Sequence, residues 1–138
     1  MSVERRLAYD GKLFRIAFAH DREGGSPAEE FFDQLPIADK VKLDQRFRIL
    51  GDLGKHSNPE MFGDLGDGLF EFKSFQIRMP YAYAKSERGL VLITHGFRKK
   101  KDKTPPGEIA RAKKILSEDA EASKVCVIND QSKKRRRP

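Results

Sequence analysis

Residues 69–97, LFEFKSFQIRMPYAYAKSERGLVLITHGF, decide the fold class of this 138-residue chain because their apolar side chains alternate with a period of two. The pattern predicts one strand over residues 69–75, a second over residues 76–84 and a third over residues 90–97. The third strand is the most apolar and is expected near the centre of the sheet. Because the connections between these strands are short, they predict an antiparallel meander.

Alternation also predicts which side chains share a face of the sheet. Phe70 and Phe72 fall on one face of the first strand, and Glu71 and Lys73 fall on the other. Lys73 is therefore expected on the open face of the sheet. In the second strand, Pro80 removes one backbone donor, which predicts a bulge or an edge position there.

Toward the N-terminus, residues 12–18 alternate as a half-buried strand. Ser26, with proline next and glutamate three residues on, is typical of a helix start and predicts a short helix over residues 29–35. Apolar side chains at spacings of mostly three and four predict a second helix over residues 37–53. Residues 54–68 carry glycine, asparagine, proline and aspartate, which predicts a loop.

Toward the C-terminus, Thr104 is a suitable cap for a third helix that runs to about Ala120. Residues 125–128 are apolar and predict a short strand. The composition then becomes polar and basic, so residues 129–138 are expected to form a disordered tail. The fold class that follows is α+β: a single domain over residues 1–128, with an antiparallel sheet, two helices before the meander packed on it and one helix after it.

Composition excludes several classes of protein. Charged residues make up 36% of the chain, and no apolar run approaches the roughly 20 residues that span a bilayer, so no membrane association is expected. No signal peptide is evident at the N-terminus, and Cys126 is the single cysteine. One cysteine fits a reducing cytoplasm and cannot supply a multi-cysteine zinc site. We therefore expect a cytoplasmic protein with no metal and no cofactor.

Positive charge is concentrated in two short segments. The formal net charge is +7, and Lys133–Arg137 alone carries five positive charges. A second segment, Arg98–Lys103, carries a net four. The rest of the chain has 18 basic and 20 acidic residues, so the body is close to neutral. Concentrated charge on a neutral body favours a polyanionic partner.

An ordered series of motifs runs through the second half of the chain. LFEFK at residues 69–73 is followed by the isolated Arg78, then by ITHGFRKK at 93–100, KTP at 103–105 and EIARA at 108–112. This series resembles the phage-derived, HigB-like branch of the RelE/HigB-type toxins of type II toxin–antitoxin systems. The order of strand, two helices, three-strand meander and helix also matches that family. A RelE-like fold is therefore expected for this chain.

The resemblance covers about residues 12–121 and leaves the basic tail outside. It implies a small endoribonuclease that cleaves mRNA without a metal, usually on the translating ribosome, and inhibits translation. The implied partners are mRNA, the ribosome and a cognate antitoxin, usually a helix-turn-helix protein in this branch. Two alternatives stay open: a non-enzymatic toxin of the same fold that poisons a protein such as DNA gyrase, and a phage-derived nucleic-acid-binding protein without catalysis.

Three residues are candidates for catalysis under this resemblance. Arg78 has the planar guanidinium that suits the charge of a phosphorane, although it could instead be a partner of Glu71. Lys73 could stabilise the same charge, or it could be a solvated strand lysine. His95 could transfer a proton, yet alternation places it with Val91 and other apolar residues, as expected of a structural histidine.

A second set is predicted to bind nucleic acid. Its basic members are expected to contact phosphates, since five of six consecutive positions carry positive charge; the alternative is a soluble loop. Its aromatic members could stack on bases, although this spacing is more typical of a core. The set comprises Arg98, Lys99, Lys100, Lys101, Lys103, Tyr81 and Tyr83.

Overall fold

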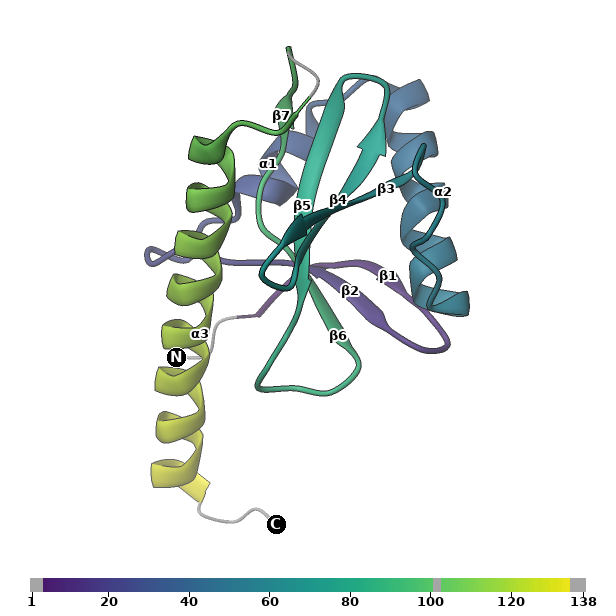
Figure 1. The fold of residues 1–138 in the computed structure, drawn as a ribbon. Coiled ribbons are helices and arrows are strands. Elements are labelled where there is room, and N and C mark those ends of the chain that lie inside the picture. Colours follow the sequence, from purple (N-terminus) through teal and green to yellow (C-terminus); the bar gives the residue numbers. More distant parts are fainter. Residues whose placement is uncertain (1–3, 101–102, 135–138) are drawn as a thin grey trace.

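The computed structural model describes residues 4–100 and 103–134, with side chains up to residue 122 (Figure 1). Over these residues, seven strands form one sheet in the order β1-β2-β6-β5-β4-β3, with β7 also paired to β5. The strands are β1 (Leu7–Asp10), β2 (Arg15–Phe18), β3 (Phe62–Gly66), β4 (Leu69–Ser74), β5 (Ile77–Tyr83), β6 (Leu90–Ile93) and β7 (Phe97–Arg98). The helices are α1 (Pro27–Asp33), α2 (Ile37–Leu53) and α3 (Pro106–Lys134).

The predicted meander is confirmed, but the sheet as a whole is mixed rather than antiparallel. β3, β4, β5 and β6 pair antiparallel in turn, whereas β2 pairs parallel with β6. Parallel pairing needs a long crossover connection, and here the chain passes through both helices and the β3–β5 strands between β2 and β6. The α+β class, with helices before and after the strands, is as expected and is that of the RelE-like fold.

Two strands were not predicted. β3 lies inside the segment expected to be a loop, and β1 extends the opposite end of the sheet beyond β2. The sequence of β3, FGDLG, has two glycines and one aspartate, which weaken a strand signal. Pairing with β4 nevertheless orders it, so tertiary contacts override local propensity.

On the β6–β7 side of β5 the ladder has one extra residue opposite Pro80, since residues 94–96 stand opposite residues 79–80. Pro80 therefore lies at a bulge, as predicted, and not at an edge. It faces Glu71 of β4 in unbroken register, inside a strand that has neighbours on both sides. On the other side of β5, the ladder stops between β6 and β7, and the Pro80 carbonyl there accepts the backbone N–H of Thr94 at 2.9 Å. The donor that proline lacks would point to this interruption, so the sheet tolerates its absence.

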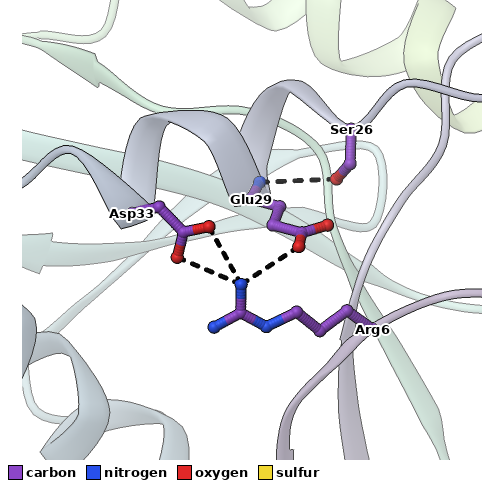
Figure 2. A network of polar contacts seen from close by, with 4 residues as sticks. All are labelled: Arg6, Ser26, Glu29 and Asp33. Carbon is purple, nitrogen blue, oxygen red and sulfur yellow. Dashed lines mark hydrogen bonds and ion pairs between the residues drawn. The ribbon is translucent and has the colours of Figure 1, made fainter.

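The two helices before the meander form as predicted, within two residues at each end. Ser26 caps α1 by accepting the backbone N–H of Glu29 at 3.4 Å, but the glutamate side chain does not complete a capping box (Figure 2). The Glu29 carboxylate instead accepts a hydrogen bond from Arg6 at 3.0 Å, and Arg6 also pairs with Asp33. This network ties the segment before β1 to α1.

The third helix is longer than predicted. α3 continues to Lys134, so the strand expected over residues 125–128 is wrong, as is the end near Ala120. The helix also includes residues 129–134, which were expected to be disordered; residues 135–138 lie outside the described residues. No proline or glycine interrupts the sequence between residues 108 and 134, so nothing stops the helix locally.

Helices cover both faces of the sheet, with α2 on one side and α3 on the other (Figure 1). The larger core lies under α1 and α2 and is dominated by large side chains from Phe47, Phe72 and Tyr81. Beneath α3 the apolar contacts are smaller and involve Ala112 and Ile115. Among the described residues, the apolar contacts beneath α3 do not extend to the β4–β5 turn, where polar side chains occupy this face of the sheet.

Candidate functional site

The β4–β5 hairpin places two of the predicted catalytic residues side by side. Lys73 lies directly opposite Arg78, and Glu71 lies opposite Pro80. Residues opposed in this way share a face, and alternation adds Glu71 to the face of Lys73. Ala82 of β5 lies on the same face as Arg78, because the two are four residues apart in the strand, and it packs against Ala112 of α3. This is therefore the face that α3 covers. α3 and its approach bury Arg78 on this face, whereas Lys73, which was expected on an open face, is half-buried.

Arg78 is an interior cation, with only 5% of its surface exposed. Its Nη1 donates to the carbonyls of Phe75 at 2.6 Å and Ile77 at 2.9 Å. Its Nε is 3.7 Å from Glu71 Oε2 and has no hydrogen-bond partner among the described residues. Burial lowers the pKa of Arg78, which Glu71 partly counters. Arg78 therefore stabilises the β4–β5 turn by binding its backbone carbonyls. Its ion pair with Glu71 agrees with the alternative in which Arg78 is a partner of Glu71.

Glu71 connects this pair to the segment before α3. Its carboxylate accepts a hydrogen bond from the Thr104 hydroxyl at 2.8 Å, and the side chain is buried. Lys73 is half-buried, and its ammonium donates to the carbonyl of Pro59 at 2.7 Å. Thr104 is predicted to cap the third helix; in the structure α3 begins at Pro106, and the Thr104 hydroxyl positions the Glu71 carboxylate.

His95 is fully buried and faces α3. Its Nε2 lies 2.9 Å from Glu108 Oε1, and its Nδ1 lies 2.9 Å from the Thr94 hydroxyl. Burial is the main cause that lowers the pKa of His95, while the hydrogen bond with Glu108 raises it and nearby Arg111 lowers it. The neutral ring donates from Nε2 to the carboxylate and accepts the threonine proton at Nδ1. Its polar partner on α3 was not expected from its grouping with apolar strand residues.

Glycine at position 96 is required by packing. A Cβ atom at Gly96 would lie 2.1 Å from Cδ2 of Phe31, a ring on α1. The chain therefore passes close to α1 between β6 and β7, and the irregular path turns His95 toward α3. The His-Gly-Phe motif thus has a structural explanation, with Phe97 parallel to the imidazole at 5.6 Å.

The basic segment follows the edge of the hairpin near its turn. Arg98 pairs with Ile77 in β7, and the backbone N–H of Lys99 donates to the carbonyl of Gln76 at 2.6 Å. Arg98, Lys100 and Lys103 are exposed, and Lys99 is half-buried. Lys101 lies outside the described residues. The structure thus brings Arg98 and Lys99 close to the β4–β5 turn, whose backbone carbonyls Arg78 binds.

The two tyrosines lie on the opposite face. Tyr81 is fully buried, stacks on Phe72 with ring centroids 4.2 Å apart, and its pKa is raised by burial. Tyr83 is partly exposed and contacts Phe14 and His56. The structure does not place either ring beside Lys73 and Arg78. For Tyr81 the core alternative is the one that the geometry supports.

Several polar groups of the site were not among the predicted residues. Glu71 and Thr104 complete the environment of Arg78, and Glu108 completes that of His95. Glu108 has 29% of its side chain exposed, which makes it the accessible end of the histidine pair. Its only signal in the sequence was its place in the EIARA motif. A spacing of 13 residues between His95 and Glu108 carries no local signal of contact.

The described residues also limit other types of site. Among the described side chains, those of residues 4–100 and 103–122, no group of three or more His, Cys, Asp or Glu could hold a metal ion. Within residues 4–100 and 103–134, none of the helices combines the length and apolar character that a membrane crossing requires.

These observations define a class of protein: a small α+β protein with a RelE-like fold and a polar cluster beside a basic segment. Comparison with known families matches residues 30–117, more than half of the chain, to the family described as phage derived protein Gp49-like (DUF891). The chain belongs to this family, which is associated with RelE-like toxins of toxin–antitoxin systems. A comparison with curated proteins gave no match.

Proposed function

We propose that this chain is the toxin of a type II toxin–antitoxin system of the HigB-like kind. It acts in the cytoplasm as a metal-independent endoribonuclease on mRNA, associates with the ribosome and inhibits translation. One observation carries the proposal: the exposed cation Arg98 pairs with the β4–β5 hairpin, and exposed Lys103 directly precedes Thr104, which binds Glu71 of the interior cluster with Arg78. Family membership supports the toxin assignment.

The proposed reaction is a transesterification within the RNA strand. The ribose 2′-oxygen forms a bond to the adjacent phosphorus, and the bond from phosphorus to the 5′-oxygen breaks. One group must take the 2′-hydroxyl proton, and another must give a proton to the 5′-oxygen. The products are a 2′,3′-cyclic phosphate and a 5′-hydroxyl, so no other reactant is needed.

The geometry suggests a division of roles. Lys73 and the exposed cations of the basic segment bind the phosphate and stabilise the charge of the phosphorane. Glu108, as the exposed end of the histidine pair, exchanges the proton, and buried His95 orients its carboxylate. Arg78 is too deep to contact RNA in this conformation, so it acts as a positioning residue for the turn.

The proposed silencing partner is an antitoxin with an acidic segment and a helix-turn-helix domain. Charge complementarity with the basic segment would speed its association at low salt. An association rate that does not change with ionic strength would contradict this mode of recognition.

The test uses the purified protein with mRNA, in the presence of a chelator and with or without ribosomes. We expect fragments that end in a 5′-hydroxyl and a 2′,3′-cyclic phosphate. Lys100→Ala should lower cleavage mildly, because neighbouring cations compensate, whereas Glu108→Gln should lower it by about 10²-fold or more. Lys85→Ala, an exposed cation on the β5–β6 turn at the other end of the hairpin, is the control. Intact mRNA in every condition, with growth arrest and inhibited DNA supercoiling in cells, would favour the gyrase-directed alternative.

A further inference from the structure

The turn between β4 and β5 exposes an aromatic ring that folding does not explain. Phe75 is 75% exposed and has a φ of +54°. This backbone conformation favours glycine, because Cβ crowds the neighbouring carbonyl in residues with a side chain. A bulky residue retained in such a conformation, with its ring in solvent, points to a function for the ring.

Cationic residues fix the backbone beneath this ring. Arg78 donates to the Phe75 carbonyl at 2.6 Å, and Arg46 of α2 donates from Nε to the Lys73 carbonyl at 2.9 Å. The backbone N–H of Lys99 binds the next carbonyl of the turn, that of Gln76. The turn is therefore anchored from β5, from α2 and from the basic segment, so the backbone that carries the ring is held in place before any ligand arrives.

The surroundings of the ring are positively charged. The ammonium of Lys42 lies 5.3 Å from the centroid of Phe75, over one face of the ring. Arg98 and Lys100 are exposed on the adjacent segment. Glu71 is the one acidic residue between residues 69 and 83, all of which are described, and it is buried beneath α3. The hairpin therefore presents an aromatic ring and cations, with no exposed carboxylate of its own.

We propose that Phe75 is a stacking platform for an unpaired base of single-stranded RNA, with the flanking phosphates bound by Lys42 and Arg98. The inference rests on the proposed function in one respect, that RNA is the ligand. With Lys42 over one face of the ring and most of the ring exposed, a base can stack on the other face. Aromatic side chains amid cations are the usual means of binding unpaired bases.

A binding cycle tests the stacking itself. A non-cleavable 2′-O-methyl RNA strand is compared with an abasic strand of the same length, for the wild-type protein and for Phe75→Ala. Wild type should bind the base-bearing strand more tightly, and Phe75→Ala should reduce this preference by about 5- to 150-fold, the range that stacking of one base provides. Phe75→Trp should retain the preference. Lys42→Ala should instead flatten the salt dependence by about 0.7 in the log–log slope.

Ile37→Ala is the matched control, because Ile37 is 78% exposed at the start of α2 and the substitution likewise removes an exposed apolar side chain. It should leave RNA binding unchanged.

The inference is overturned if wild type binds both strands with equal affinity, or if Phe75→Ala keeps the preference for the base-bearing strand, even where mRNA is cleaved. A preference that Phe75→Ala removes, in a protein that cleaves no mRNA, supports the platform and contradicts the proposed nuclease. If Phe75→Ala and Ile37→Ala both spare RNA binding but weaken binding of the antitoxin, the surface is a protein-docking site and the inference is wrong.

Discussion

The face of the sheet beneath α1 and α2 is filled with aromatic rings, whereas the face beneath α3 ends in buried charges near the β4–β5 turn. On the first face, Phe72 lies between Phe47 and Tyr81, with ring centroids 4.9 Å and 4.2 Å away. On the second, Arg78 and Glu71 are both buried. The same two strands supply both sets, because successive side chains alternate between faces.

Under the proposed function, stability and chemistry are divided between the two faces. Burial of apolar side chains is the main source of stability, while buried charges lower it unless they are paired. Substitutions on the aromatic face should therefore change the free energy of unfolding most. Those on the α3 face and at the turn should affect stability less and RNA binding or cleavage more.

The largest expected effect is at the centre of the aromatic face. Phe72→Ala should lower the free energy of unfolding by about 3–5 kcal/mol, because it removes a fully buried ring and leaves a cavity. Urea unfolding followed by circular dichroism measures this change. Phe70→Ala, on the same face but only partly buried, is the control and should cost less. Equal losses at the two positions would contradict the proposed centre of the core.

Arg78 gives the next largest effect and tests the boundary between stability and function. Arg78→Ala should cost about 3 kcal/mol, because it leaves the buried Glu71 carboxylate without its charge partner and frees two turn carbonyls. The double variant Glu71→Gln with Arg78→Met should recover part of this loss in the same urea experiment. A stable Arg78→Ala protein that has lost cleavage alone would instead place the guanidinium in contact with RNA.

His95 provides a pH-dependent difference between the faces. Because its pKa is lowered in the folded protein, the unfolded chain binds more protons than the folded protein as pH falls below about 6.5. Its contribution to stability is therefore present above that pH and decreases toward pH 5, with a slope of at most about 1.4 kcal/mol per pH unit. His95→Gln should lack this part of the slope, which is measured as the difference between the two proteins. Parallel pH profiles would show that the imidazole is not buried in the neutral form.

The smallest expected change is at the turn and has the opposite sign. Phe75→Gly should raise the free energy of unfolding by roughly 0.5–1 kcal/mol, because glycine tolerates the positive φ that phenylalanine does not. The same variant should weaken RNA binding, so stability and binding would change in opposite directions. Thermal unfolding provides the measurement, with Phe75→Ala as the control that keeps Cβ and should show no such gain. A loss of stability in Phe75→Gly would show that the ring is part of the packing.

Features that depend on neighbouring residues along the chain could be predicted from the sequence. The bounds of α2, the cap at Ser26 and the three strands of the meander follow from local periodicity and capping chemistry. Alternation also places Ile77, Met79 and Tyr81 on one face and Arg78 on the other, as in the structure. The order of the motifs indicated the family.

Tertiary structure alone decided which face is covered and which groups meet. Alternation assigns side chains to faces but does not show that α3 covers the face of Arg78, which buries a residue that was a candidate to contact RNA. The parallel pairing of β2 with β6 depends on the crossover between them, which local patterns do not encode. Glu71 meets Thr104 across 33 residues, and His95 meets Glu108 across 13. Such contacts, and the positive φ that presents Phe75 to solvent, follow from the packing of whole elements rather than from any local pattern in the sequence.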